Sequence, residues 1–193
     1  MSSNTCVSRM KNWILIFALI LPLFAVSQPP AGYYDDAEGL TGSALKTALH
    51  NIISNGYTIT VYDDLWDVYP ITDNKPNGKV WDMYSDIPGG TPPYEFTFVT
   101  DQCGNYSSEG DCYNREHSVP QSWFGGSMPM YSDMFHVVPT DGKVNGQRSN
   151  YPFGEVSSAS WTSLNGSKLG PCSFPGYTAT VFEPIDSFKG DFA

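Results

Sequence analysis

An apolar stretch near the start of the chain decides how much of the sequence is available to fold. Arg9 and Lys11 precede this stretch, which runs from Trp13 to Val26 and is followed by the small residue Ser27. The pattern is typical of a secretory signal peptide, and the stretch is too short to span a bilayer comfortably. We therefore predict a signal peptide over residues 1–27, cleaved between Ser27 and Gln28, rather than a retained anchor helix. Residues 28–193 then remain, enough for one domain with a hydrophobic core.

The charge balance limits the partners that such an exported domain can bind. The formal net charge of the whole chain is −10, and it becomes −12 once the two basic residues of the signal peptide are removed. Affinity for nucleic acid comes mainly from Lys and Arg, so the composition by itself argues against a nucleic-acid partner. Any nuclease hypothesis therefore requires a metal ion and a few local basic residues.

Three cysteines remain after cleavage: Cys103, Cys112 and Cys172. Cys103 and Cys112 are close enough in the sequence to close a small loop in an oxidising compartment. Such a disulfide would contribute about 2–3 kcal/mol through loop entropy. Cys172 would then be either a buried thiol or a cysteine whose partner is missing from this chain.

The local patterns predict one helix, one turn and one strand ahead of the chemistry-bearing residues. Thr41 is a plausible N-cap for a helix that ends at Asn55-Gly56, with His50 on its solvated side. Residues 73–78 only faintly resemble a calcium-binding loop and are better explained as a Pro-Asn-Gly turn. Residues 94–98 alternate aromatic with polar side chains, which predicts a half-buried strand.

The first group of reactive side chains centres on Glu116 and His117. A neutral imidazole can take a proton from water near pH 7, and a carboxylate is a hard oxygen ligand suited to Mg²⁺ or Ca²⁺. Neighbours in a regular strand point to opposite faces, so both side chains reach one site only if the backbone bends there. A surface pair in a salt bridge is the alternative. We interpret His136, in an extended stretch, as a structural histidine that orients the site rather than as a metal ligand.

A second group follows on a predicted short helix. Thr140 or Asp141 can cap this helix, on which Asp141, Asn145 and Arg148 share a face. An Asn carbonyl with an Arg one turn later offers a neutral metal ligand beside a phosphate clamp. The alternative is an ordinary capped helix whose polar side chains face water.

Three blocks carry a resemblance to a known family: residues 114–124 (NREHSVPQSWF), 132–139 and 144–150. In this order they resemble the active-site stretches of the bacterial endonuclease I family, secreted or periplasmic nucleases of the His-Me finger (ββα-metal) class. The resemblance runs from about Leu65 to Ala193, and the N-terminal helix is compatible with it. It implies an α+β fold, a single domain over residues 28–193 with a ββα-metal core, additional helices and long loops.

The resemblance also implies a role for each matching side chain. His117 would be the general base that activates the attacking water, and Glu116 and Asn145 would hold one divalent metal ion. Mg²⁺ is the expected ion, with Ca²⁺ or Mn²⁺ as alternatives. We expect Arg148 to contact the scissile or a neighbouring phosphate. We expect His136 and Asp141 to contact these residues and hold them in place without touching the substrate.

The implied activity is hydrolysis of DNA, and of RNA as well, without sequence specificity and through contacts to the phosphate backbone. Cleavage would leave 5′-phosphates, and the secreted or periplasmic enzyme would act as a monomer, with no membrane association in the mature form. Relatives continue beyond residues 189–193 into a further aromatic helix. With the unpaired Cys172, this leads us to expect a domain truncated at its C-terminus.

Two other classes of function compete with the nuclease hypothesis. A non-catalytic exported protein could use its aromatic residues, 15% of the chain, to bind nucleic acid or carbohydrate. Simple binding would not need the combination of Glu116, His117 and Asn145, however. A metalloprotease would need clustered ligands such as a helical His-Glu-x-x-His, and the three histidines of this chain lack that spacing.

Overall fold

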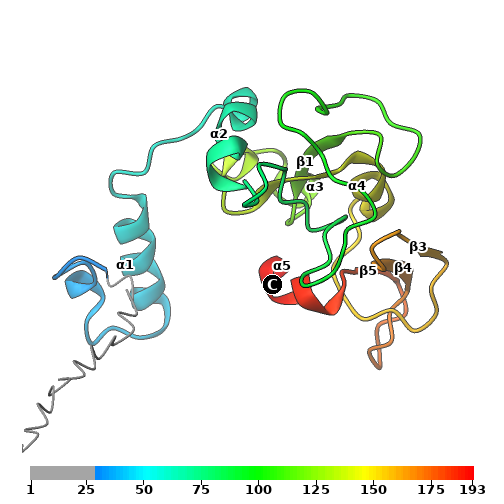
Figure 1. Cartoon of the computed structure of the whole chain (residues 1–193). Coiled ribbons are helices and arrows are strands. Elements are labelled where there is room, and N and C mark those ends of the chain that lie inside the picture. Colours follow the sequence, from blue (N-terminus) through cyan, green and yellow to red (C-terminus); the bar gives the residue numbers. More distant parts are fainter. Residues whose placement is uncertain (1–28) are drawn as a thin grey trace, which may run out of the picture. The chain divides into compact units, whose positions relative to one another are not determined.

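The computed structural model describes residues 29–193 (Figure 1). The described residues divide into two compact units, residues 29–57 and 58–193. The predicted signal peptide, with its cleavage site between Ser27 and Gln28, lies outside the described residues. Among residues 29–193, none of the helices has the length and the apolar character that a membrane crossing requires.

The first unit contains the predicted amphipathic helix. A short 3-10 helix, η1 (Asp35–Ala37), precedes α1 (Gly42–Ser54). Thr41 stands at the N-cap with extended backbone, and Asn55 at the C-cap is followed by Gly56 with φ +77°, a conformation that favours glycine. Both predicted ends of the helix are thus confirmed. His50 is exposed, as expected for the solvated side.

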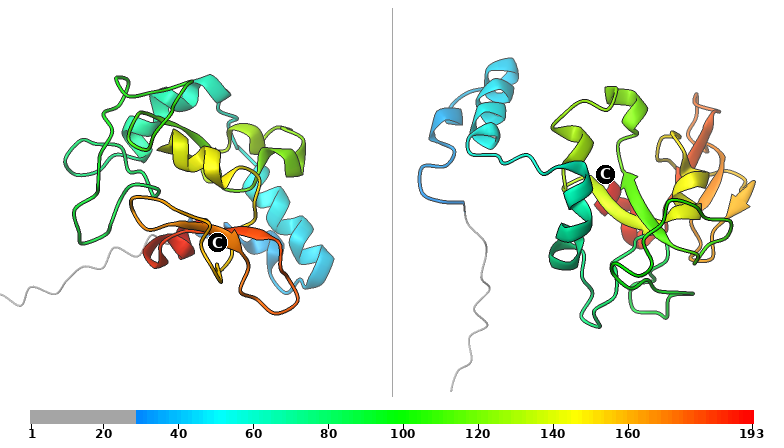
Figure 2. Two further views of the ribbon diagram at one scale, coloured as in Figure 1. Left: turned by 90° about the vertical axis from the view of Figure 1, so that its right-hand side faces the viewer. Right: turned by 90° about the horizontal axis from the view of Figure 1, so that it is seen from above.

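The centre of the second unit is a strand pair followed by a helix. Strand β1 (Tyr113–His117) pairs antiparallel with β2 (Val137–Asp141), so that Glu116 lies opposite Val138. Helix α4 (Gly142–Arg148) follows β2 without a loop, and Figure 2 shows it beside the two strands. Chain order and packing therefore give a β-β-α unit, and the mixture of helix and strand confirms the predicted α+β class.

A small sheet forms the C-terminal part of the second unit. It consists of β3 (Trp161–Thr162), β4 (Lys168–Pro171) and β5 (Thr180–Glu183), all antiparallel and in that order. Tyr84, Val144 and Phe182 are fully buried and pack together, which joins α4 to this sheet. The remaining short helices are η2 (Tyr62–Asp64), α2 (Leu65–Thr72), α3 (Gln121–Phe124), η3 (Met130–Ser132), η4 (Asp186–Phe188) and α5 (Lys189–Phe192).

A second buried cluster lies on the other side of the strand pair. It joins α2 to both strands and to the long segment between α2 and β1. Its buried members are Leu65, Tyr69, Val80, Phe96, Tyr113 and Val137. The β-β-α unit is therefore supported from both sides, by this cluster and by the one beneath α4.

The predicted strand over residues 94–98 is wrong as an element, although its burial pattern is right. Phe96 is buried, Tyr94 and Phe98 pack against the same cluster, and Glu95 is exposed. The segment nevertheless forms no strand, because its backbone bonds are isolated ones, such as Val80 N to Phe96 O at 3.0 Å. Alternation requires only one buried face, whereas a strand also requires a partner with a continuous ladder.

The interpretation of residues 73–78 as a turn is confirmed. The amide of Gly78 donates to the carbonyl of Lys75 at 2.8 Å, and Gly78 has φ +79°. The amide of Lys75 also donates to the carbonyl of Lys79, on the other side of the turn, at 2.9 Å. The segment thus closes a tight turn through its own backbone, as the Pro-Asn-Gly sequence predicts.

Candidate functional site

Glu116 and His117 meet in one pocket at the end of β1. The pocket has a volume of about 340 Å³ and is also lined by Asn145 and Arg148 of α4. Both strand residues are buried, with 2% and 7% of their surfaces exposed. The structure therefore brings together all four side chains that the sequence pointed to. It does so at the last two residues of β1, where the strand ends.

Glu116 is a buried carboxylate held by two side-chain donors. The Tyr84 hydroxyl donates to its Oε1 at 2.7 Å, and Nη1 of Arg148 donates to the same oxygen at 2.8 Å. Burial raises the pKa of Glu116 to about 7, although the charge of Arg148 opposes this shift. A further positive charge placed beside Glu116 would therefore stabilise its ionised form.

His117 is fixed in one tautomer by a backbone carbonyl. Its Nε2 lies 3.0 Å from the carbonyl oxygen of Tyr131, which can only accept, so Nε2 carries the proton and Nδ1 is left with a free lone pair. The rings of Tyr62 and Tyr131 lie nearly parallel to the imidazole, with centroids 5.8 and 5.7 Å away. Burial lowers the pKa of His117, which favours the neutral form able to accept a proton.

His136 stands next to His117 but faces a different partner. The two imidazole rings are nearly perpendicular, with centroids 5.8 Å apart. Nε2 of His136 lies 2.7 Å from the carbonyl oxygen of Met130, so this ring is also held by the η3 segment. The placement agrees with a structural histidine that packs against the site, and its orienting role stays a prediction.

Asp141 caps helix α4 and ties its N-terminus to the neighbouring loop. Its Oδ1 accepts from the amide of Val144 at 2.7 Å and its Oδ2 from the amide of Gly110 at 2.8 Å. Of the two caps that the sequence allowed, the structure uses Asp141 rather than Thr140. Asp141 is fully buried, so it supports the helix and does not face the pocket.

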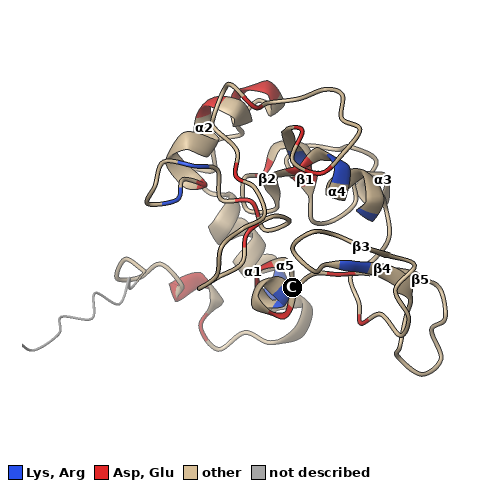
Figure 3. Ribbon diagram, turned by 45° about the vertical axis from the view of Figure 1, so that its right-hand side comes forward, with Lys and Arg blue, Asp and Glu red and all other residues tan. Residues whose placement is uncertain are grey.

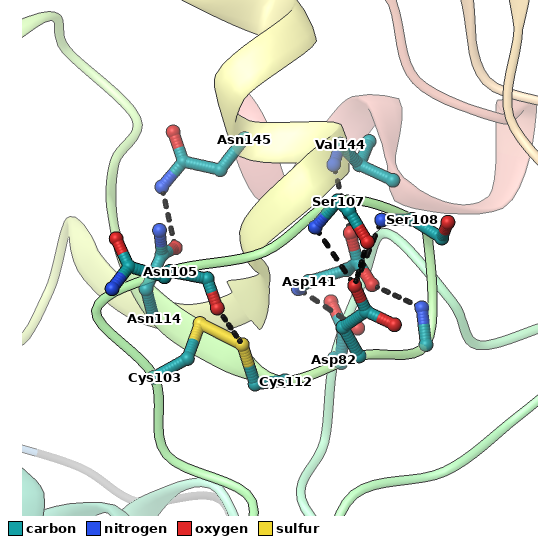
Figure 4. Close-up of a disulfide and its surroundings, with 12 residues drawn as sticks. Asp82, Cys103, Asn105, Ser107, Ser108, Cys112, Asn114, Asp141, Val144 and Asn145 are labelled. Carbon is teal, nitrogen blue, oxygen red and sulfur yellow. Dashed lines mark hydrogen bonds between the residues drawn. A yellow bond between two sulfur atoms is a disulfide. The ribbon is translucent and has the colours of Figure 1, made fainter.

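Asn145 is oriented by a neighbour on β1. Its Nδ2 donates to Oδ1 of Asn114 at 2.8 Å and to the carbonyl of Arg115 at 3.3 Å. Figure 4 shows the consequence, because the amide nitrogen points to Asn114 and the carbonyl oxygen points the other way. The oxygen is thereby left available as a neutral ligand, and its predicted role in holding a metal ion stays a prediction.

Arg148 is the most deeply buried cation of the site. Only 1% of it is exposed, and it donates to Glu116, to the carbonyls of His117 and Ser118, and to the carbonyl of Tyr151. These bonds hold the chain at the point where β1 ends. The predicted contact with phosphate would have to come from a guanidinium that already serves four protein acceptors.

Arg115 is the second cation at the pocket. Its guanidinium lies 3.6 Å from the ring centroid of Tyr62 and 4.6 Å from that of Trp66, and Nη1 donates to the carbonyl of Tyr62 at 2.6 Å. Basic positions are scarce in this unit, and Figure 3 shows some of them on β1 and α4, which carry Arg115, Lys143 and Arg148. Arg115 is 15% exposed at its side chain, so it is more accessible than Arg148.

The predicted disulfide between Cys103 and Cys112 is present and lies near the start of α4 (Figure 4). The amide of Gly142, the first residue of α4, donates to the carbonyl of Cys112 at 3.0 Å. The bridged loop therefore touches the helix that carries Asn145. Cys172 is a free, partly buried thiol; both alternatives from the sequence leave it unpaired, so the choice between them stays open.

With this geometry in view, the comparisons with known proteins identify the relationship. The profile of the endonuclease I family matches residues 41–193. This chain belongs to the endonuclease I family. An extracellular ribonuclease of Bacillus subtilis (strain 168) is 31% identical over 183 residues, which cover 90% of this chain and 55% of that protein. An extracellular ribonuclease of Bacillus amyloliquefaciens is 33% identical over 169 residues, which cover 83% of this chain and 50% of that protein.

The chain therefore spans about half the length of the curated relatives it matches. No solved structure matches it at a significant level. Family membership therefore rests on the sequence. The pocket at the end of β1 is where the residues that resemble the family's active-site stretches come together.

The metal ion implied for endonuclease I proteins fits the residues present. Both donors to Glu116 bind Oε1, so its second oxygen has no side-chain donor among the described residues. The Asn145 carbonyl oxygen is the second available ligand. Within residues 29–193 no cluster of three His, Cys, Asp or Glu could hold an ion. A site with one carboxylate and one amide oxygen suits Mg²⁺, which keeps several waters and binds substrate phosphate oxygens.

The sequence reasoning missed three residues that hold the site: Tyr84, Asn114 and Tyr131. Asn114 lies inside a block that resembles the family, but its partner Asn145 is 31 residues away. Tyr84 reaches Glu116 across 32 residues, and Tyr131 reaches His117 across 14, through its backbone rather than its side chain. No local pattern reports such contacts. The sequence carried no signal for these partners, because the burial of Glu116 is itself a property of the tertiary structure.

Proposed function

We propose that this chain is an exported, metal-dependent endonuclease that hydrolyses phosphodiester bonds of nucleic acid. The proposal rests on the imidazole of His117, whose Nε2 is bound to a carbonyl oxygen and which lines one pocket with Glu116 and Asn145. A committed tautomer, a buried carboxylate and an oriented amide oxygen are the parts that metal-assisted hydrolysis needs. The names of the two ribonuclease relatives support both export and action on RNA.

In the proposed reaction, Nδ1 of His117 accepts a proton from a water molecule as its oxygen attacks phosphorus. The bond between phosphorus and the 3′-oxygen breaks, the 3′-oxygen takes a proton from solvent, and the products are a 5′-phosphate and a 3′-hydroxyl. A divalent ion held by Glu116 and Asn145 would neutralise charge on the phosphate and on the departing oxygen. The Tyr131 carbonyl stabilises the imidazole as it becomes charged, because Nε2 already donates to it.

The two arginines of the pocket have different roles in the proposed reaction. Arg148 holds Glu116 and the end of β1, since its donors are bound to the protein. Arg115, whose side chain is the more accessible, is the better-placed contact for a phosphate next to the scissile one. Contacts of this kind read phosphates and not bases, which accounts for cleavage of DNA and RNA without sequence specificity.

The test is cleavage of single-stranded RNA and of supercoiled plasmid by the exported chain with Mg²⁺, Mn²⁺ or Ca²⁺, with and without a chelator. We expect cleavage that the chelator abolishes, products with 5′-phosphates, and a loss of about 10²–10⁴-fold in rate for His117→Ala. His50→Ala is the matched control, because His50 is exposed on α1. Intact substrates in every metal would leave a non-catalytic binding protein as the better description.

A further inference from the structure

A second hollow of unit 58–193 is lined by exposed aromatic rings. It has a volume of about 610 Å³ and lies between α3, residues 152–155 and the loop that joins β4 to β5. Trp123, Phe174 and Tyr177 contribute rings that are 59%, 72% and 44% exposed. We call this hollow the aromatic groove. Folding alone does not account for three large rings turned to solvent in one place, because burial would stabilise each of them.

The aromatic groove lies next to the pocket at the end of β1. Helix α3 contributes Gln121 to the pocket and Trp123 to the groove. The guanidinium of Arg148, which lines the pocket, lies 4.5 Å from the ring centroid of Phe153, which lines the groove. One polymer strand lying in the pocket can therefore extend directly into the groove.

The charges around the groove indicate whether the phosphates or the bases of a nucleic acid would bind there. No Lys or Arg lines it, and its one acidic side chain, Glu155, is paired with Lys189 at 2.7 Å. The loop between β4 and β5 carries neither basic nor acidic positions, as Figure 3 shows. Such a surface has little attraction for phosphates. Flat aromatic faces, in contrast, stack with any nucleobase, provided that the base is not already stacked in a duplex.

We propose that the aromatic groove binds unpaired nucleobases next to the scissile phosphate, so that single-stranded nucleic acid is the preferred substrate of this chain. The inference rests on the proposed nuclease function and adds a substrate class to it. Stacking supplies affinity that the acidic molecule cannot obtain from phosphates. Trp123 and Phe174 become specificity-determining residues, because they contact bases and not the reacting atoms.

The decisive experiment combines a variant with removal of the bases. The initial rates of the wild type and of Trp123→Ala are measured on two dye-labelled single strands of equal length, one of ordinary nucleotides and one of abasic residues. We expect Trp123→Ala to raise KM for the ordinary strand about 5- to 150-fold, which corresponds to about 1–3 kcal/mol of stacking, with little change in kcat. On the abasic strand the two proteins should have the same KM.

Three further variants separate stacking from general damage. Trp123→Phe should restore much of the KM, because it keeps a ring, and Phe174→Ala should act in the same direction as Trp123→Ala. Leu164→Ala is the matched control, since Leu164 is 63% exposed and lies outside the groove. Unchanged KM on the ordinary strand in both Trp123→Ala and Phe174→Ala would overturn the proposal. If the wild type cleaves neither strand, the proposed nuclease function has failed instead.

A binding measurement tests the groove without catalysis. Cys172 lines the groove and is the free thiol of the described residues, so its alkylation rate reports on access to that surface. In the His117→Ala variant, the ordinary strand should slow alkylation of Cys172, whereas the abasic strand should not. Equal rates with and without the ordinary strand would show that the groove binds something other than bases, such as another polypeptide segment, and would overturn the proposal.

Discussion

At the scale of single residues, the pair Asn114 and Asn145 shows how the site depends on an indirect contact. Asn145 offers one oxygen to a cation, and which end of its amide faces the pocket is set by the bond to Asn114 Oδ1. Supporting partners of this kind typically change metal affinity or activity by about 10–100-fold when they are removed. The contact is therefore as testable as the ligand itself.

We expect Asn114→Ala to weaken apparent Mg²⁺ affinity by about 10–100-fold, because the amide of Asn145 loses its fixed orientation. The measurement is the Mg²⁺ concentration that gives half-maximal cleavage, together with the shift of melting temperature on adding Mg²⁺. Asn114→Asp keeps an acceptor for Nδ2 of Asn145 and should recover most of the affinity. Equal Mg²⁺ responses in wild type and Asn114→Ala would show that Asn145 is oriented by other contacts.

A second residue-scale prediction concerns Asp82, a carboxylate buried beneath α4. It accepts from the amides of Tyr84 at 2.8 Å and Asp141 at 3.1 Å, and it faces the carboxylate of Asp141. Burial raises its pKa to about 7, above the ordinary value of about 4. The folded state thus holds this proton more tightly than the unfolded chain does, and the associated stability is lost as pH rises through about 7.

Asp82→Asn removes this titration and should flatten part of the pH dependence of stability. We expect the melting temperature of the variant, relative to wild type, to rise between about pH 4 and about pH 7, by several degrees in total. Asp67→Asn on the exposed face of α2 is the control and should keep the wild-type profile. A constant difference between Asp82→Asn and wild type at all pH values would contradict the assignment of the raised pKa.

At the scale of elements, the disulfide loop packs directly against the helix that carries Asn145. Gly142 and Gly146 stand one turn apart on α4, on the face that meets Tyr106 of the loop. A Cβ at Gly142 would lie 2.6 Å from Cδ1 of Tyr106, and a Cβ at Gly146 would collide with the Tyr106 ring and hydroxyl. The two glycines therefore permit a close approach that no larger residue allows.

This packing predicts that the effect of Gly146→Ala on stability changes sign when Tyr106 is removed. In an otherwise wild-type chain, Gly146→Ala should lower stability by about 1–3 kcal/mol, because the new methyl group overpacks the contact with Tyr106. In a Tyr106→Ala background the same change should raise stability by up to about 1 kcal/mol, because Ala is the better helix former. Thermal unfolding of the four proteins measures the cycle. If Gly146→Ala had the same effect in both backgrounds, the loop would not restrict α4.

The elements also show which parts of the fold were accessible to sequence reasoning. Helix α1 and the cap of α4 were predictable because caps, periodicity and stop signals act within a few residues. The segment 94–98 was mistaken for a strand because alternation reports one buried face and says nothing about a hydrogen-bonding partner. The sheet β3–β5 was not predicted at all, since its strands have two to four residues and too little pattern of their own.

The candidate site divides in the same way. Glu116, His117, Asn145 and Arg148 could be chosen from residue chemistry and from the resemblance of three blocks to the endonuclease I family. Their burial and their partners could not, because a donor such as Tyr84 reaches the site only through tertiary packing. The sequence therefore predicts which side chains react, and the fold determines how each is protonated and oriented.

At the scale of the whole molecule, the charge balance opposes binding to nucleic acid outside the pocket. Residues 58–193 contain seven Lys and Arg against 17 Asp and Glu. Three of the lysines, Lys75, Lys168 and Lys189, are engaged in ion pairs with carboxylates. The cations left near the substrate are the two arginines of the pocket, so few phosphates can be neutralised.

The salt dependence of binding should reveal this small number of contacts. For a single strand, the logarithm of the binding constant falls with the logarithm of salt concentration with a slope of about −0.7 per phosphate contacted. With Arg115 as the main phosphate contact and Arg148 already bound to protein acceptors, we expect a slope of about −0.7 to −1.4 for the His117→Ala variant, measured by fluorescence anisotropy at constant Mg²⁺. Arg115→Ala should make the slope shallower, and Lys143→Ala, on the same helix as Arg148 but outside the pocket lining, should leave it unchanged. A slope steeper than about −4 would mean that several more phosphates are neutralised than this pocket can reach, and that cations elsewhere in the molecule dominate binding.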